Sequence, residues 1–212
     1  AMSSLSVILG HPDRLRTLAK DLVEHYEALC SEKPDVVQKT MVVCSERKHA
    51  YELWKEVVAL RPEWAESRKS EDDSALTAEQ LEELVELPKV NIVATRGEND
   101  EKELYNLCGS KEHRKMLDKQ FKNNDSNFKM AIVVDMWITG FDVPSLSVMY
   151  IDKPLQKHTL VQTISRVNRV FEGKDKGLVV DYIGIKEDME QAIKQYGDDG
   201  GSPVDELAIT LG

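Results

Sequence analysis

The chain has 212 residues, of which 41% are hydrophobic and 31% are charged. This length suits one α/β domain with a full hydrophobic core and is too short for two large domains. No run approaches the roughly 18 apolar residues that a membrane span needs. No basic segment followed by an apolar core indicates a signal peptide, and Ala1 and Met2 are interpreted as foreign residues ahead of the natural segment.

The formal charge of -10 argues against nucleic-acid binding through bulk electrostatics. The charge is unevenly placed, however, because residues 63–103 hold thirteen acidic and five basic residues. The rest of the chain is therefore nearly neutral, and net charge does not exclude a nucleic-acid partner. We interpret the acidic region as a solvated face, with a partner-docking surface as the alternative.

The cysteines are scattered and odd in number, at Cys30, Cys44 and Cys108. None has a C-x-x-C partner, and the five histidines show no H-x-x-x-H pattern, so we expect neither disulfides nor a metal site. A reducing, cytoplasmic location fits this usage best.

The first half of the chain alternates helical and strand patterns. Pro12 and Asp13 suit a helix start, and apolar residues follow at helical spacing. Residues 39–44 form a short apolar run typical of a buried parallel strand. We expect Ser45 to cap a helix over residues 46–60. An acidic stretch at about 61–88 is interpreted as a loosely packed insertion with one helix, 77–87, that a capping box opens.

The second half is more regular. The pattern predicts strands at 90–94, 129–134, 146–151 and 177–182, and helices at 101–107, 110–122, 159–169 and 187–196. Buried strands that alternate with helices predict an α/β fold of three layers, with a mainly parallel sheet and helices on both faces. We expect a leading helix in residues 3–35, the domain itself in 36–196 and a tail in 197–212.

The most informative segment is Gln-Thr-Ile-Ser-Arg-Val-Asn-Arg at residues 162–169. On a helix Gln162, Arg166 and Arg169 follow the spacing i, i+4, i+7 and point the same way. Guanidinium groups bind phosphate oxygens in a bidentate manner and keep their charge. The segment therefore favours a phosphate clamp, with an exposed helix carrying surface arginines as the alternative.

A second motif, Thr139-Gly-Phe-Asp142, follows a predicted strand on the side where open α/β sheets hold ligands. Gly140 permits close approach of the backbone to a ligand. Asp142 could accept a hydrogen bond from a ribose hydroxyl. The alternative is an ordinary connection in which Asp142 binds local amides before Pro144.

Together these motifs resemble a known family. Residues 129–184, and more loosely 11–59, are similar to the C-terminal RecA-like domain of superfamily 2 helicases, and in detail to the motor subunit of type I restriction enzymes. The segments that carry the resemblance are Val-Asp-Met-Trp-Ile-Thr-Gly-Phe-Asp-Val-Pro-Ser-Leu at 134–146, Tyr-Ile-Asp-Lys-Pro-Leu at 150–155, residues 162–169, and Gly-Leu-Val-Val-Asp-Tyr-Ile-Gly at 177–184.

The resemblance implies a role for each matching residue. Arg166 and Arg169 match the motif VI arginines that reach the ATP phosphates, and Gln162 matches the glutamine that opens that motif. Gly140 and Asp142 match motif V, near the nucleotide. The DNA contacts implied by motif IV, the following strand and motif V are Ser45, Arg47, Thr95, Arg96 and Thr139. Thr139 and Ser165 stand where many superfamily members have arginine and glycine, which leaves a DNA contact at Thr139 open.

The resemblance also implies parts that this chain does not carry. No segment matches G-x-x-x-x-G-K-[ST], so ATP and Mg²⁺ are expected to be held with a first RecA-like lobe, and the chain alone is expected to hold neither and to be inactive. The implied partners are double-stranded DNA, the first lobe and a nuclease domain of the same subunit, and methylase and specificity subunits.

Three alternatives stay open on the sequence. A superfamily 2 repair or remodelling helicase would share the same lobe, and a binding module could keep the fold without the motor. Glu172-Gly-Lys174 matches the E-x-K of restriction nucleases, but its position after the motif VI helix favours a turn.

Overall fold

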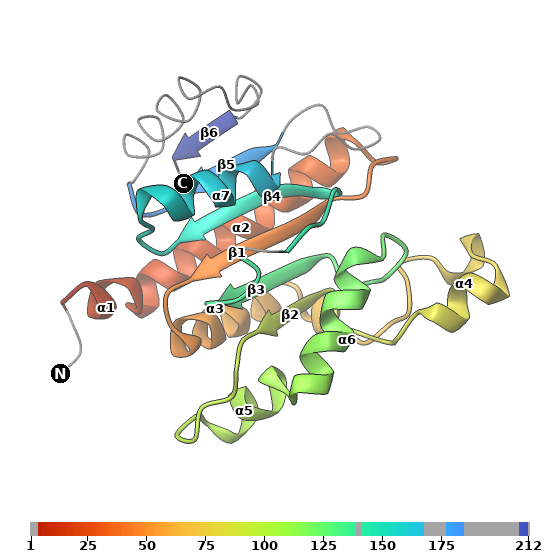
Figure 1. Ribbon diagram of the computed structural model, residues 1–212, viewed down its shortest axis with the longest axis horizontal. Helices are drawn as coiled ribbons and strands as arrows, with labels where there is room; N and C mark the ends of the chain where they lie inside the picture. The colour runs from red at the N-terminus through yellow and green to blue at the C-terminus, as the bar shows by residue number, and fades with distance from the viewer. Residues whose placement is uncertain (1–3, 139–140, 168–176, 185–207, 212) are drawn as a thin grey trace.

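The computed structural model describes residues 4–138, 141–167, 177–184 and 208–211. Within these residues six parallel strands form one sheet in the order β2-β3-β1-β4-β5-β6 (Figure 1). The strands are β1 (Lys39–Cys44), β2 (Val90–Val93), β3 (Met130–Val134), β4 (Leu146–Asp152), β5 (Leu178–Asp181) and β6 (Ala208–Leu211).

Helices cover both faces of the sheet, as the sequence predicts. One face packs against α2 (Pro12–Glu32), α3 (Arg47–Leu60) and α5 (Lys102–Cys108), and the other against α6 (Lys111–Lys122) and α7 (Lys157–Val167). The remaining described helices are α1 (Ser4–Leu9), α4 (Ala78–Glu83) and the 3-10 turns η1 (Pro62–Ala65) and η2 (Asp73–Ala75). No helix in the described residues is both long and apolar enough to cross a membrane.

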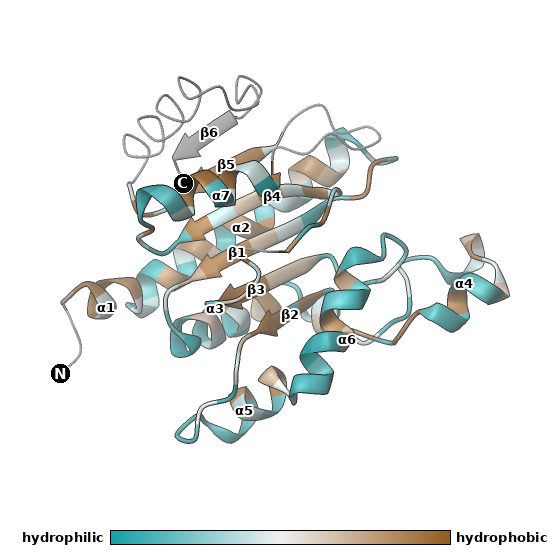
Figure 2. Ribbon diagram, viewed as in Figure 1, coloured by the Kyte–Doolittle hydropathy of each residue, from teal (hydrophilic) through white to brown (hydrophobic). Residues whose placement is uncertain are grey.

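The central strands are apolar because they are covered on both faces. Every residue of β1, β3 and β4 is buried. Along β1, Val42 and Cys44 point into the core under α2 and α3, whereas Met41 and Val43 point into the core under α6 and α7. Figure 2 shows the apolar residues gathered in the strands, while α6 is largely hydrophilic on its outer side.

Two helix ends differ from the sequence prediction. Helix α3 has Glu46 as its N-cap residue, without a capping side chain, so the cap predicted at Ser45 is wrong. Thr77 and Gln80 form the expected capping box, but α4 ends at Glu83 instead of continuing to residue 87. The buried Gln120 side chain donates to the Glu83 carbonyl and accepts from the Val85 amide, which holds the chain in a non-helical path.

The acidic stretch at residues 61–88 is anchored more firmly than the sequence suggests. Trp64, Leu84 and Leu87 are buried, and Arg68 and Leu87 form an antiparallel bridge. Its polar residues still face solvent for the most part.

The C-terminal segment contains a strand that the sequence analysis did not foresee. Strand β6 pairs in parallel with β5 and extends the sheet at one edge. The helix predicted at 187–196 lies outside the described residues.

Candidate functional site

The loops that carry the predicted motifs leave the sheet at one edge. In the parallel register Cys44 lies beside Val134, and Val93 lies beside Val133. Ser45, Thr95 and the segment after β3 therefore start at the same level, at the carboxyl ends of their strands. Open α/β sheets bind ligands at this edge.

Helix α7 contacts the segment after β3 through Arg166. Its Nη1 donates a hydrogen bond to the carbonyl oxygen of Phe141 at 2.9 Å. Its Nε is buried and has no hydrogen-bond partner among the described residues. Gln162 lies one helical turn earlier and is exposed, and Asp142, which follows Phe141 directly, is half-buried. Thr139, Gly140 and Arg169 lie outside the described residues.

The segment between β3 and Phe141 has an unusual backbone. Asp135 and Trp137 have φ angles of 55° and 62°, in the left-handed region that residues with a side chain seldom adopt. The Trp137 ring stacks on Phe141 with centroids 4.2 Å apart and planes at 4°, and Lys153 Nζ lies 2.5 Å from Asp135 Oδ1. These contacts hold the backbone in a costly conformation, as is common at ligand sites.

A cavity of about 530 Å³ lies beside this segment. Its walls include Thr95 from the loop after β2, Trp137, and three basic side chains of α6, which are Lys111, Arg114 and Lys115. The pKa of the nearby His113 is lowered by burial and then by the positive charges of Arg96 and Arg114. Asp118 also lines the cavity, but it forms an ion pair with Lys122, so the three basic side chains leave the cavity positively charged and suited to an anionic ligand.

The basic residues predicted from the sequence have partners within the protein. Arg47 Nε lies 3.1 Å from both carboxylate oxygens of Asp100. The Arg96 guanidinium stacks 4.2 Å from the centroid of the Tyr105 ring, and its Nε donates to the Tyr105 carbonyl. Ser45 Oγ lies 3.4 Å from His49 Nδ1. Among the members of this predicted set that the structure describes, Thr95 alone lines the basic cavity.

The basic residues of α6 were missed in the sequence. Lys111, Arg114 and Lys115 have the spacing of one helix face, but a basic helix face is usually a solvated surface. They form part of a cavity only because Thr95 and Trp137, which follow the ends of two strands, lie beside them. A single sequence does not reveal that proximity.

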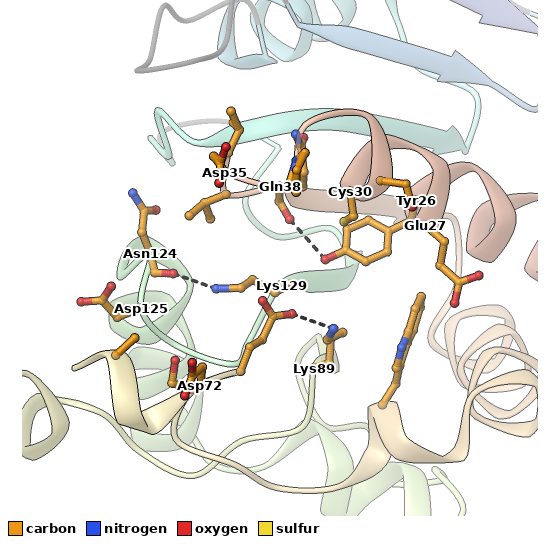
Figure 3. A pocket seen from close by; sticks show the side chains of 18 of the residues that line it. Tyr26, Glu27, Cys30, Asp35, Gln38, Asp72, Lys89, Asn124, Asp125 and Lys129 are labelled. Carbon is orange, nitrogen blue, oxygen red and sulfur yellow. Dashed lines mark hydrogen bonds and ion pairs between the residues drawn. The ribbon is translucent and has the colours of Figure 1, made fainter.

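A larger cavity, of about 680 Å³, lies at the opposite, amino end of the strands (Figure 3). Its two lysines have partners within the protein. Lys89 forms an ion pair with Glu71 at 2.7 Å, and Lys129 Nζ donates to the carbonyls of Asn124 and Ser126, both at 2.7 Å. The candidate site is therefore the one at the carboxyl edge of the sheet. Among the described residues, no group of three or more His, Cys, Asp or Glu side chains could hold a metal ion.

Comparisons with known proteins agree with this architecture. Residues 19–184 match the family model of type I restriction enzyme subunit R domain 3. The HindI type I restriction enzyme endonuclease subunit of Haemophilus influenzae is 35% identical over 198 residues, which cover 92% of this chain and 17% of that subunit. The chain thus spans about a sixth of the length of this relative.

Solved structures share the fold. A fragment of a subunit assigned as HsdR of a type I restriction enzyme, from Vibrio vulnificus YJ016, has a TM-score of 0.58 at 16% identity and covers all of this chain and 34% of that one. T4 UvsW has a TM-score of 0.51 at 14% identity, over all of this chain and 37% of that one. The fold is the RecA-like α/β fold, and the chain belongs to the family of type I restriction enzyme subunit R domain 3.

Proposed function

We propose that the chain is the second motor lobe of an ATP-dependent DNA translocase in a type I restriction endonuclease. ATP would bind between this domain and a first RecA-like lobe of the same subunit. Arg166 and Arg169 would contact the phosphates, and Gln162, Gly140 and Asp142 would line the nucleotide site. The observation that supports this most is the buried Nε of Arg166, which has no partner among the described residues.

A buried guanidinium N–H without a partner is costly and fits a ligand that accepts hydrogen bonds. The bond from Nη1 to the Phe141 carbonyl fixes the direction of the Arg166 side chain. Such a pre-oriented arginine stabilises the negative charge that develops on the phosphate during transfer. Mg²⁺, bound with ATP by residues of the first lobe, would neutralise the charge on the phosphate oxygens.

The basic cavity would contact the DNA backbone. Lys111, Arg114 and Lys115 would act together with the predicted contacts Ser45, Arg47, Thr95 and Arg96, which follow the carboxyl ends of β1 and β2. Thr139, the remaining predicted contact, lies outside the described residues. Lysine and arginine contacts to phosphates supply affinity without reading sequence. This suits a motor that moves along double-stranded DNA of any sequence.

The ATP site would lie in a cleft between the two lobes. Opening and closing of this cleft would drive the movement of the whole subunit. ATP hydrolysis would step the complex along DNA and feed a nuclease domain of the same subunit. Methylase and specificity subunits would complete the assembly and choose the recognition site.

The division of the ATP site between two lobes gives a direct test. The chain alone, with ATP, Mg²⁺ and duplex DNA, should hydrolyse no more ATP than a mock preparation. A longer version of the subunit that includes the first lobe should hydrolyse ATP when DNA is added. Hydrolysis by the chain alone would contradict the proposal, as would a two-lobe protein that folds, binds ATP and is not stimulated by DNA.

A further inference from the structure

Arg47, at the start of α3, is held by one nitrogen only. Its Nε lies 3.1 Å from each carboxylate oxygen of Asp100. Its terminal groups, Nη1 and Nη2, make no hydrogen bond to a described residue, and the side chain is 38% exposed. The contact therefore fixes the guanidinium and leaves the N–H groups of its terminal nitrogens without a hydrogen-bond partner among the described residues.

Asp100 is itself fixed by a tight turn. Its side chain is only 8% exposed, and its Oδ2 accepts a hydrogen bond from the Gly97 amide at 2.6 Å. The Asp100 amide donates to the Gly97 carbonyl at 3.2 Å. Asp100 thus has little freedom to move away from Arg47.

Gly97 completes the support because Arg47 packs directly against its Cα. A Cβ at position 97 would lie 2.0 Å from Arg47 Nη2 and 2.8 Å from Asp100 Oδ1. Real side chains do not tolerate contacts this short, so any larger residue at 97 would displace the guanidinium. Arg47, Gly97 and Asp100 therefore form one unit, the Arg47 seat.

The Arg47 seat lies among other cationic groups. Burial raises the pKa of the Cys108 thiol, as does the charge of Asp100, and the charges of Arg47, Arg114 and Arg96 oppose the shift. The charges of all three guanidinium groups thus act on one buried thiol. One of these three, Arg114, also lines the cavity beside α6.

We infer that Asp100 is a positioning residue, which orients Arg47 so that its terminal nitrogens receive a DNA phosphate. The inference rests on the DNA contact of the proposed function. A carboxylate so close to DNA weakens the overall attraction. The arrangement still favours binding because a pre-oriented arginine loses less side-chain freedom when it binds.

The test is the salt dependence of duplex DNA binding by the 212-residue chain, for Arg47→Ala, Asp100→Ala and the double variant. Each phosphate contact contributes about 0.9 to the slope of log K against log salt concentration. We expect each single variant to lower the slope by about 0.9, and the double variant to lower it no further. Asp35→Ala removes an exposed acid far from the Arg47 seat and controls for net charge.

Asp100→Asn guards against misfolding, since its amide oxygen can still accept from Gly97 while the ion pair is lost; it should lower the slope as Asp100→Ala does. Arg47→Ala could lower the slope while the Asp100 variants leave it unchanged or bind DNA more tightly than Asp35→Ala. In that case the positioning role of Asp100 is wrong, and the DNA contact of Arg47 stands. If the unaltered chain shows no salt-dependent binding, or Arg47→Ala changes nothing, the DNA contact at Arg47 fails and the inference fails with it.

Discussion

Arg166 on α7 donates a hydrogen bond to the carbonyl oxygen of Phe141, which lies 25 residues earlier in the chain, before strand β4. The Phe141 ring stacks on Trp137, which lines the basic cavity. One short chain of contacts thus joins the proposed ATP-contacting arginine to the proposed DNA surface. Binding at one site can change the affinity of the other only if the segment after β3 adopts two conformations. Its strained residues, Asp135 and Trp137, are where such conformations would differ.

Removing a basic side chain of α6 should weaken DNA binding without changing the fold. Lys115→Ala removes one of the three cationic groups at the cavity beside Thr95. We expect the salt slope of DNA binding to fall by about 0.9 while the unfolding midpoint stays the same. Lys20→Ala removes the same charge from the exposed surface of α2 and should leave the slope unchanged. Equal effects of the two changes would exclude a specific contact at Lys115.

The stack of Trp137 on Phe141 should stabilise the domain strongly. Trp137 is buried against Phe141 and Phe121, so Trp137→Ala removes a large buried side chain and leaves a cavity. The expected loss in the free energy of unfolding is about 3–5 kcal/mol, measured by urea denaturation. Trp54→Ala, on the half-buried face of α3, should cost clearly less. A smaller loss at Trp137 than at Trp54 would show that strain at this position outweighs the stacking.

Lys39 should make stability depend on pH in the alkaline range. Burial, followed by the charge of Lys129, lowers the pKa of Lys39 well below its ordinary value of 10.5. Between that lowered pKa and 10.5 the unfolded chain binds more protons than the folded chain, so the contribution of Lys39 to stability rises with pH and is lost as pH falls.

Urea denaturation from pH 7 to pH 10 measures this effect. The Lys39→Met variant should lack this contribution. As pH rises, the free energy of unfolding of the natural chain should therefore increase relative to that of the variant. Lys20→Met, at an exposed position, is the matched control and should track the natural chain. A constant difference across the range would mean that the protonation of Lys39 does not change on folding.

The sequence predicted the sheet well because its strands are short apolar runs, and β1 lies at the predicted residues 39–44. It predicted α4 too long because no local pattern reports that Gln120, far along the chain, binds the backbone at Glu83 and Val85. Strand β6 was missed because four residues, Ala-Ile-Thr-Leu, carry too little pattern without their neighbour β5.

At the candidate site, too, local sequence patterns and tertiary contacts contribute different residues. Arg166 could be proposed as a phosphate contact from its spacing on one helix together with the resemblance, and this role stays a prediction. The Arg47 seat could not, because Asp100 and Gly97 meet Arg47 only through a turn between two separate elements. The basic face of α6 was equally ambiguous until Thr95 and Trp137 lay beside it. Tertiary contacts, which a single sequence does not encode locally, supplied these parts.

In the proposed function Arg166 completes an ATP site that is shared with a first lobe. The most direct measurement is DNA-stimulated ATP hydrolysis by the two-lobe protein, with Arg166→Ala and Arg166→Lys compared with Arg16→Ala, a change at an exposed arginine of α2. We predict that Arg166→Ala lowers the stimulated rate by about 10³-fold or more while DNA binding is retained, and that Arg16→Ala has no effect. Arg166→Lys keeps the charge but loses the guanidinium geometry, so it should recover little. Stimulated hydrolysis at the natural rate in Arg166→Ala would contradict the account.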